Sequence, residues 1–163
     1  AFALERARKH SIAAVHFSTK THPDPLNYAN ELIRLHEEKG IELVLLAGYM
    51  KLLPPKFISL YKGRILNIHP ALLPKYGGKG MFGHHVHEAV IAAKDYESGA
   101  TIHWVTERYD EGPILLQKAI AVLPEDDAES LARRVLSVEH ALYPEAVRLV
   151  LSNQVVFPNR YTD

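Results

Sequence analysis

The sequence contains no cysteine, which excludes a disulfide framework, a thiolate zinc site and a cysteine nucleophile. It also lacks a surplus of charge, because 19 basic residues balance 19 acidic residues. A chain without net charge has no overall field to attract nucleic acid or an anionic membrane, so we expect neither partner. No apolar run approaches the roughly 18 residues of a membrane span, and we find no signal peptide. We therefore expect a cytoplasmic protein.

The composition is that of an ordinary globular protein, with 47% hydrophobic and 23% charged residues. The length of 163 residues predicts a single domain over residues 1–163. The opening segment, Ala1–Arg8, has the pattern of a charged amphipathic helix with neither a cap nor an initiator methionine before it. We therefore expect the chain to be truncated at its N-terminus.

Short apolar runs alternate with segments of helical spacing along the chain. The runs at 12–15, 43–47, 64–69, 101–106 and 114–122 are predicted to be strands. This alternation predicts an α/β domain built on a mostly parallel, doubly wound, Rossmann-like sheet. Ligands of such sheets bind outside the carboxyl ends of the strands, so candidate site residues should lie there.

Two polar residues stand at the carboxyl end of the predicted strand 64–69. Side chains alternate along a strand, so Asn67 and His69 project from the same face. Pro70 keeps His69 extended. An amide beside an imidazole at this edge suits a substrate site. The structural alternative is a buried pair whose polar atoms are satisfied by the backbone.

Asp110 lies in a turn directly after the predicted strand 101–106, ahead of Gly112 and Pro113. It can therefore reach the same edge of the sheet as His69. A carboxylate beside an imidazole raises the pKa of the ring and fixes its orientation. The alternative is an aspartate that caps its own turn.

Three histidines, at positions 84, 85 and 87, follow a glycine-rich stretch. No glutamate stands at the spacing of a zinc-protease helix, and His85 and His87 would diverge on a helix. We therefore predict no metal site. Surface histidines or a mobile loop that covers the substrate are the readings that this pattern favours.

Several motifs resemble those of the folate-dependent formyltransferases. The run 67–76 (NIHPALLPKY) is similar to the signature of that family, and 47–53 (AGYMKLL) looks like its folate-binding segment. The strand 101–105 leads into 109–113 (YDEGP), which looks like its catalytic-aspartate loop. The segment 138–144 (VEHALYP) resembles the members that act on glycinamide ribonucleotide. The similarity runs through essentially the whole chain, with the motifs in the expected order.

The resemblance implies a formyltransferase fold and transfer of the formyl group of 10-formyltetrahydrofolate to the amine of glycinamide ribonucleotide, a step of purine (IMP) biosynthesis. Asn67, His69 and Asp110 would be the catalytic residues. Glu139 would contact the ribonucleotide, and the Leu73–Pro74 bond would be cis. The folate, as co-substrate, would contact Met50, Lys51, Leu52, Leu53, Asn67, Thr106, Glu107, Arg108, Tyr109 and Asp110.

The chain departs from the family pattern at its start. The first strand of the family, and the loop of glycine and serine that binds the substrate phosphate, would precede Ala1. We therefore expect the fold without its N-terminal β-α unit. Three alternatives remain: a methionyl-tRNA formyltransferase, a formyltetrahydrofolate deformylase, or a non-catalytic module that keeps the folate pocket. Monomer and homodimer are both open.

Overall fold

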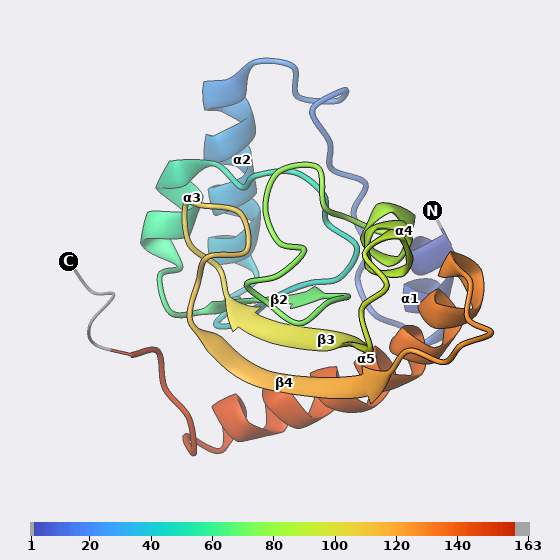
Figure 1. Cartoon of the computed structure of the whole chain (residues 1–163). Helices are drawn as coiled ribbons and strands as arrows, with labels where there is room; N and C mark the ends of the chain where they lie inside the picture. The colour runs from blue at the N-terminus through green and yellow to red at the C-terminus, as the bar shows by residue number, and fades with distance from the viewer. Residues whose placement is uncertain (1, 159–163) are drawn as a thin grey trace. The chain divides into compact units, whose positions relative to one another are not determined.

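The computed structural model describes residues 2–158, and the chain forms two compact units, residues 1–41 and 42–163. The first unit contains helices α1 (Phe2–Lys9) and α2 (Pro25–Glu38) (Figure 1). Helix α2 begins where the sequence supplies a cap, because the Asp24 carboxylate accepts a hydrogen bond from the Asn27 N–H at 2.7 Å. Pro25 occupies the first turn, where its missing N–H costs nothing.

The prediction of a strand at residues 12–15 is wrong. Ile12 and Val15 are 62% and 60% exposed, and the described residues of this unit form helices but no strand. A strand is stable only when a neighbouring strand pairs with its backbone N–H and C=O groups. An apolar run of four residues does not reveal whether such a neighbour exists.

The second unit is built on a sheet in the order β1-β2-β3-β4. Strand β1 (Val44–Leu46) leads through helix α3 (Pro55–Leu60) to β2 (Ile65–His69). Helix α4 (His84–Ala92) precedes β3 (Glu97–Trp104), which is followed by β4 (Ile114–Ala121) and helix α5 (Ala128–Leu151). The predicted α/β architecture is confirmed.

The expectation of a mostly parallel sheet is wrong for the described strands. Strands β1 and β2 are parallel, but β2 pairs antiparallel with β3, and β3 pairs antiparallel with β4. Strands β3 and β4 are joined by the short turn 105–113, which returns the chain at the end where β3 stops and so forces antiparallel pairing. The direction of a strand depends on where its connection returns, and an apolar run carries no information on that.

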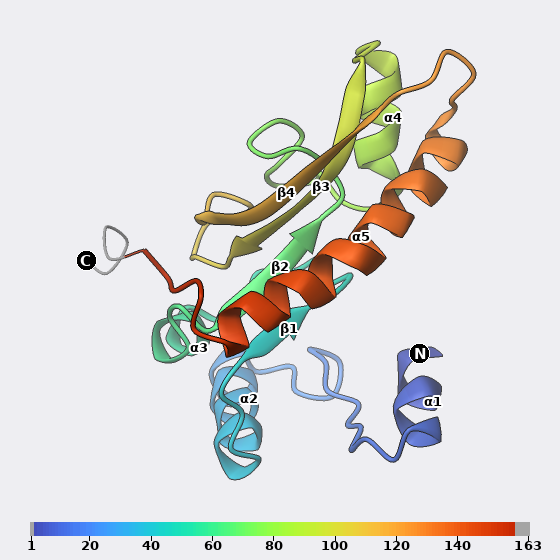
Figure 2. The ribbon, with the colours of Figure 1, turned by 90° about the horizontal axis from the view of Figure 1, so that it is seen from below.

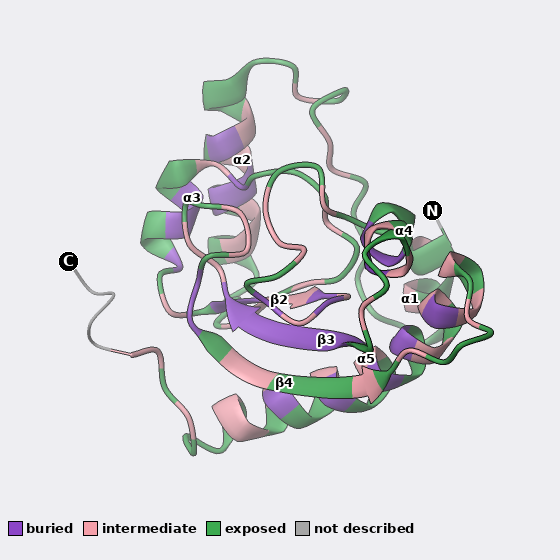
Figure 3. Cartoon of the chain, viewed as in Figure 1, coloured by how far each residue is buried: buried purple, intermediate pink, exposed green. Residues whose placement is uncertain are grey.

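Helix α5 lies along the sheet and closes its core (Figure 2). Asp127 begins it with a capping box, in which Asp127 and Ser130 each accept the other's backbone N–H. Strand β3 is buried along nearly its whole length, whereas β4 is exposed or half-buried (Figure 3). The core consists of Leu66, Val90, Ala100, Ile102, Trp104, Leu131, Val135, Val138, Leu142 and Ala146.

Two polar side chains fasten β1, β2 and the loop after β2 to their surroundings. The Tyr143 hydroxyl of α5 lies 2.9 Å from the carbonyl oxygen of Leu46 and 3.1 Å from that of Leu66, and shares its proton between them. The Thr101 hydroxyl donates to the Ala71 carbonyl oxygen at 2.6 Å. These bonds hold the carboxyl end of β1, the start of β2 and the loop after β2.

The Leu73–Pro74 bond is cis, as the resemblance implied. It lies in the loop after β2, whose buried residues Ala71 and Leu73 fix it to the sheet. Within residues 2–158, no helix has both the length and the apolar character needed to cross a membrane.

Candidate active site

A cavity of about 680 Å³ opens at the carboxyl ends of β1 and β2. Its floor contains Asn67, His69, His103 and Asp110. Its other walls come from the loop after β1, the glycine-rich loop before α4, the turn between β3 and β4, and one face of α5. A cavity of this size, mostly apolar with a few convergent polar groups, suits a ligand as large as a cofactor.

Asn67 and His69 both line this cavity, as strand alternation predicts. The His69 ring is buried, with 4% of its surface exposed. Its Nε2 lies 2.7 Å from the carbonyl oxygen of Tyr76. A carbonyl can only accept, so Nε2 carries a proton and donates it, and Nδ1 is the nitrogen that gains or loses a proton.

Asp110 reaches the same floor from the turn after β3. One carboxylate oxygen, Oδ2, lies 3.7 Å from Nδ1 of His69 and accepts a hydrogen bond from the Gly78 N–H at 2.9 Å. The other, Oδ1, lies 3.5 Å from Nε2 of His103. Asp110 has a φ of 55°, in the left-handed region that aspartate tolerates better than most residues. The predicted meeting of Asp110 with His69 is confirmed.

The electrostatics of the pair differ from the sequence expectation in one respect. Burial lowers the pKa of His69, and the neighbouring Asp110 carboxylate offsets this only in part. The expected rise of the His69 pKa is therefore wrong, because the ring is more deeply buried than the sequence indicates. Burial would also raise the pKa of Asp110, but the hydrogen bond from the Gly78 N–H and the neighbouring His69 hold it below its usual range.

The turn that carries Asp110 passes very close to β3, and this requires a glycine. A Cβ on Gly112 would lie 1.7 Å from the carbonyl oxygen of Trp104. On the facing loop, a Cβ on Gly77 would lie 2.6 Å from a methyl carbon of Leu73 and 3.2 Å from Cβ of Asp110. Glycine at both positions therefore lets the two loops meet around the carboxylate.

His103 completes the floor, and the sequence interpretation did not assign it to the site. Its Nδ1 donates to the Trp104 carbonyl oxygen at 3.0 Å, so Nε2 of the neutral ring is an acceptor. The amide nitrogen of Asn67 lies 3.1 Å from Nε2 and donates to it. His103 thereby sets which way the Asn67 amide points, and leaves the second N–H of that amide to the cavity.

The residues that the resemblance assigned to folate lie mostly on the loop walls. Met50, Lys51 and Leu52 are exposed at the cavity, and Leu53 is buried behind them. From the opposite side come Thr106, Arg108 and Tyr109, whereas Glu107 does not line the cavity. The structure thus brings together all of the assigned residues except Glu107.

Glu139 lines the cavity from the face of α5. It is half-buried, and this burial raises the pKa of its carboxyl group. A carboxylate held at a cavity wall can accept a hydrogen bond from an amine or hydroxyl of a ligand.

The three histidines at the start of α4 take different positions. His84 and His85 are exposed and lie 3.5 Å and 3.2 Å from the carboxylate of Glu88. His87 is buried at the cavity wall, its Nδ1 has no hydrogen-bond partner in the described chain, and burial lowers its pKa. Within residues 2–158, no three histidine or carboxylate side chains gather as a metal site would require.

Comparison with known proteins identifies the architecture. The family model described as "Formyl transferase" matches residues 1–147. The chain belongs to the formyl transferase family. The predicted formyltransferase fold is confirmed by the structure of glycinamide ribonucleotide transformylase 1 from Symbiobacterium toebii, which is similar with a TM-score of 0.89 and 38% identity. That match covers 98% of this chain and 73% of the other.

Relatives of known name agree with this membership. The chloroplastic phosphoribosylglycinamide formyltransferase of Arabidopsis thaliana is 44% identical over 152 residues, which is 93% of this chain and 52% of that protein. The phosphoribosylglycinamide formyltransferase of Escherichia coli is 40% identical over 144 residues, which is 88% of this chain and 66% of that protein. The chain thus spans about half the length of the plant relative.

The sequence interpretation missed two parts of this site. His103 sits in the apolar strand β3, and it meets Asn67 because the two residues are partners in the antiparallel register of β2 and β3. A polar side chain at alternate positions of that strand, Thr101 and His103, is the signal that could have marked it. The backbone groups of Tyr76 and Gly78, which bond to His69 and Asp110, cannot be recognised from a sequence.

Proposed function

We propose that this chain catalyses transfer of the formyl group from 10-formyltetrahydrofolate to the amine of glycinamide ribonucleotide. The observation that carries the proposal is the meeting of Asn67, His69 and Asp110 on the floor of one cavity. Membership of the formyl transferase family and the names of the relatives support the choice of reaction. The three side chains are the proposed catalytic residues.

The chemistry needs a developing negative charge to be stabilised and a proton to be moved. The substrate amine attacks the formyl carbon, a tetrahedral intermediate forms, and the bond from that carbon to N10 of the folate breaks. The N–H of Asn67 that does not bond to His103 is placed to donate to the oxyanion. Removing such a donor typically lowers turnover by a factor of about 10²–10³. No nucleophilic side chain is required.

The proton lost by the amine is gained by N10, and we assign this transfer to His69 and Asp110. The 3.7 Å between Nδ1 and Oδ2 is too long for a direct hydrogen bond, so a substrate atom or a water molecule fits between them. A neutral His69 can take the proton at Nδ1, and the charged Asp110 stabilises the imidazolium that results. Nε2 keeps its own proton throughout and donates it to the Tyr76 carbonyl oxygen.

We assign the remaining walls by their chemistry. The exposed apolar side chains of Met50 and Leu52, with the turn 106–109, would hold the folate, and Lys51 would pair with its carboxylates. Glu139 would accept a hydrogen bond from the glycinamide end of the ribonucleotide. Cytoplasmic location, and the absence of nucleic-acid and membrane partners, stay predictions, as does the choice between monomer and homodimer.

The experiment is a formyl-transfer assay that identifies the product. Formylated glycinamide ribonucleotide supports the proposal, formate released without ribonucleotide indicates a deformylase, and folate binding without turnover indicates a binding module. Formylated methionyl-tRNA would point to the remaining alternative. Any of the last three outcomes, if no formylated ribonucleotide is found, contradicts the proposal.

Glu139→Gln tests the ribonucleotide contact within the same assay. We expect KM for the ribonucleotide to rise about tenfold, as for the loss of one hydrogen bond to a charged group, while KM for the folate stays within twofold. Glu145→Gln, an exposed position on the same helix, is the matched control. An unchanged KM for the ribonucleotide would remove Glu139 from the site.

A further inference from the structure

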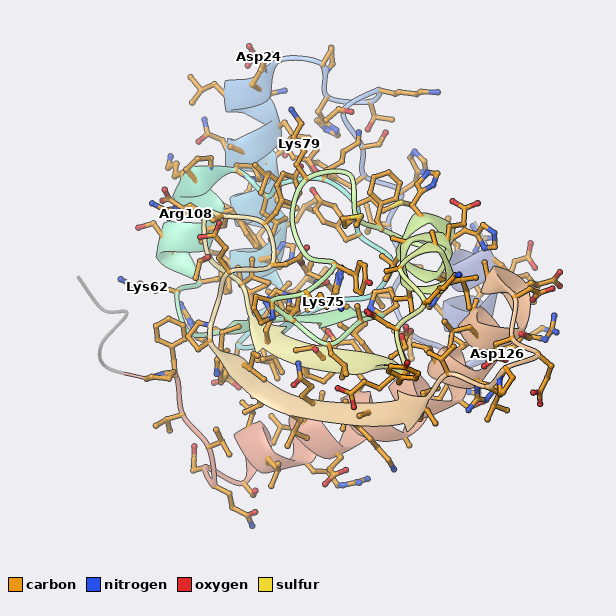
Figure 4. All side chains as sticks on the ribbon, viewed as in Figure 1. Asp24, Lys62, Lys75, Lys79, Arg108 and Asp126 are labelled. Atoms are coloured by element: carbon orange, nitrogen blue, oxygen red, sulfur yellow. The ribbon has the colours of Figure 1, made fainter. Side chains whose placement is uncertain are left out.

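A cluster of three polar side chains lies outside the active-site cavity and beside a second cavity of about 620 Å³. Asp95, between α4 and β3, receives the Lys75 ammonium at 2.7 Å and 2.5 Å on its two oxygens. The Tyr76 hydroxyl donates to the same carboxylate at 2.6 Å. Lys75, in the loop after β2, is marked in Figure 4. None of the three lines the active-site cavity.

The backbone of the same loop holds both groups of the proton-transfer pair. The Tyr76 carbonyl oxygen accepts from Nε2 of His69, and two residues later the Gly78 N–H donates to Asp110. Residues 76–78 thus form a clip around the pair. Tyr76 has a φ of 57°, a left-handed conformation that an aromatic residue rarely adopts, so the clip needs support from outside.

Asp95 supplies that support on the side away from the cavity. It binds the side chains of two successive residues, so it restrains both the position and the rotation of the Tyr76 peptide unit. The hydrogen bonds to Lys75 and Tyr76 lower the pKa of Asp95, so its carboxylate remains charged at neutral pH. Burial and the bond to Asp95 raise the pKa of Tyr76, which keeps its hydroxyl a donor.

We infer that Asp95 is a positioning residue for His69, acting through the clip that places the Tyr76 carbonyl against Nε2. By fixing the proton on Nε2, the clip makes Nδ1 the nitrogen that exchanges a proton. Nδ1 faces Asp110, and His103 and His87 are the other titratable groups near the ring. The inference rests on the proposed role of His69 in formyl transfer.

A role confined to stability predicts something different. An ion pair of Lys75 and Asp95 that served only to fasten the loop would change the unfolding midpoint when removed, and would leave the tautomer and pKa of His69 as they are. The tautomer is therefore the deciding measurement. It can be read by nitrogen NMR of the histidine side chains, whether or not the protein turns over substrate.

The experiment compares Asp95→Ala and Asp95→Asn with the unchanged protein, and His69→Gln identifies the resonances of His69. In the unchanged protein we expect the tautomer with the proton on Nε2. Asp95→Ala should give a mixture of tautomers and shift the His69 titration, whereas Asp95→Asn, which keeps an acceptor for Tyr76, should be intermediate. In the formyl-transfer assay, kcat of Asp95→Ala should fall about 10- to 100-fold while KM for the folate stays within twofold.

Glu129→Ala is the matched control, since it removes an exposed ion pair with Arg133, 2.7 Å long, near the start of α5. It should leave the His69 resonances unchanged. If Asp95→Ala does not fold, Tyr76→Phe tests the same link, because it removes one bond and keeps the Lys75 ion pair. A folded variant whose His69 keeps its tautomer and titration would overturn the inference. Failure of the proposed reaction is distinguishable, because the protein without any substitution would then show no formyl transfer.

Discussion

The two sides of the active-site cavity differ in how firmly the protein itself holds them. On the strand side, the side chains of His69 and His103 are buried, and each of their nitrogens lies beside a polar partner. On the loop side, Met50 and Leu52 are 58% and 47% exposed. The strand side is therefore arranged before any substrate arrives, whereas the loop side gains most of its contacts from the ligand.

This difference suits the two tasks that the proposed formyl transfer would require. Stabilising a charge that exists only in the transition state requires donors that are already in place. Holding a large apolar ligand requires surface that becomes buried on binding. Substitutions on the strand side should consequently lower kcat, and those on the loop side should raise KM or Kd.

The largest effect is expected for Asp110→Asn. The neutral amide can neither stabilise an imidazolium on His69 nor carry the proton, so kcat should fall about 10³-fold, within the range for positioned proton transfer. The affinity for a folate analogue, measured by fluorescence titration, should stay within twofold. Glu125→Gln, an exposed position before α5, is the control. Turnover within twofold of the unchanged protein would contradict the assignment of Asp110.

The contact between Asn67 and His103 sharpens the comparison, because it lies wholly on the strand side. Asn67→Ala should lower kcat about 10²-fold by removing an oxyanion donor. His103→Leu should cost about tenfold, since it removes only the acceptor that orients the amide. In the double variant, His103→Leu should add little to the loss already caused by Asn67→Ala. Additive losses would mean that His103 acts independently of Asn67.

Part of this site could be predicted from the sequence because its logic is local. Alternation along one strand placed Asn67 and His69 on one face, and the turn after the next strand brought Asp110 to the same edge. The remainder depends on tertiary register. Only the antiparallel pairing of β2 and β3 sets His103 opposite Asn67, and only the path of the loop brings the Tyr76 carbonyl to His69.

The fold, like the site, could be predicted from the sequence only in part. Leu131, Val135, Val138 and Leu142 are spaced four, three and four residues apart, which is sufficient to indicate a helix, and all four are buried in α5. Apolar spacing was insufficient for the direction of β3, which depends on the route of a connection. It also failed for residues 12–15, because a strand forms only where two segments pair, and the spacing of one segment does not show whether a second lies beside it.

Acid should destabilise the folded chain, because His69 on β2 and His87 on α4 are buried without full compensation. Burial lowers the pKa of both His69 and His87, so the unfolded chain binds more protons than the folded chain at pH values below about 6.5. The free energy of unfolding should therefore rise with pH up to this value and fall on acidification. The raised pKa of Glu139 acts in the opposite sense, since its contribution is lost as pH rises through the folded-state value.

Urea unfolding between pH 5 and pH 7.5 at constant ionic strength measures this dependence. His87→Leu removes one of the two groups and should flatten the slope. A slope that His87→Leu leaves unchanged would show that His87 does not titrate differently in the folded and unfolded chain.

The smallest effect is expected on the loop side, at Lys51. Its side chain is exposed at the cavity, so an ion pair with the carboxylate tail of the folate would be screened by solvent and worth about two- to fivefold in affinity. Lys51→Ala should raise Kd for the folate by that factor, leave kcat unchanged, and lose its effect in about 0.5 M salt, where the Debye length is only a few ångströms. Lys56→Ala, on α3 and outside the cavity lining, is the control. A fall in kcat for Lys51→Ala would break the separation between the two sides, since it would place a determinant of the chemical step on the wall assigned to binding.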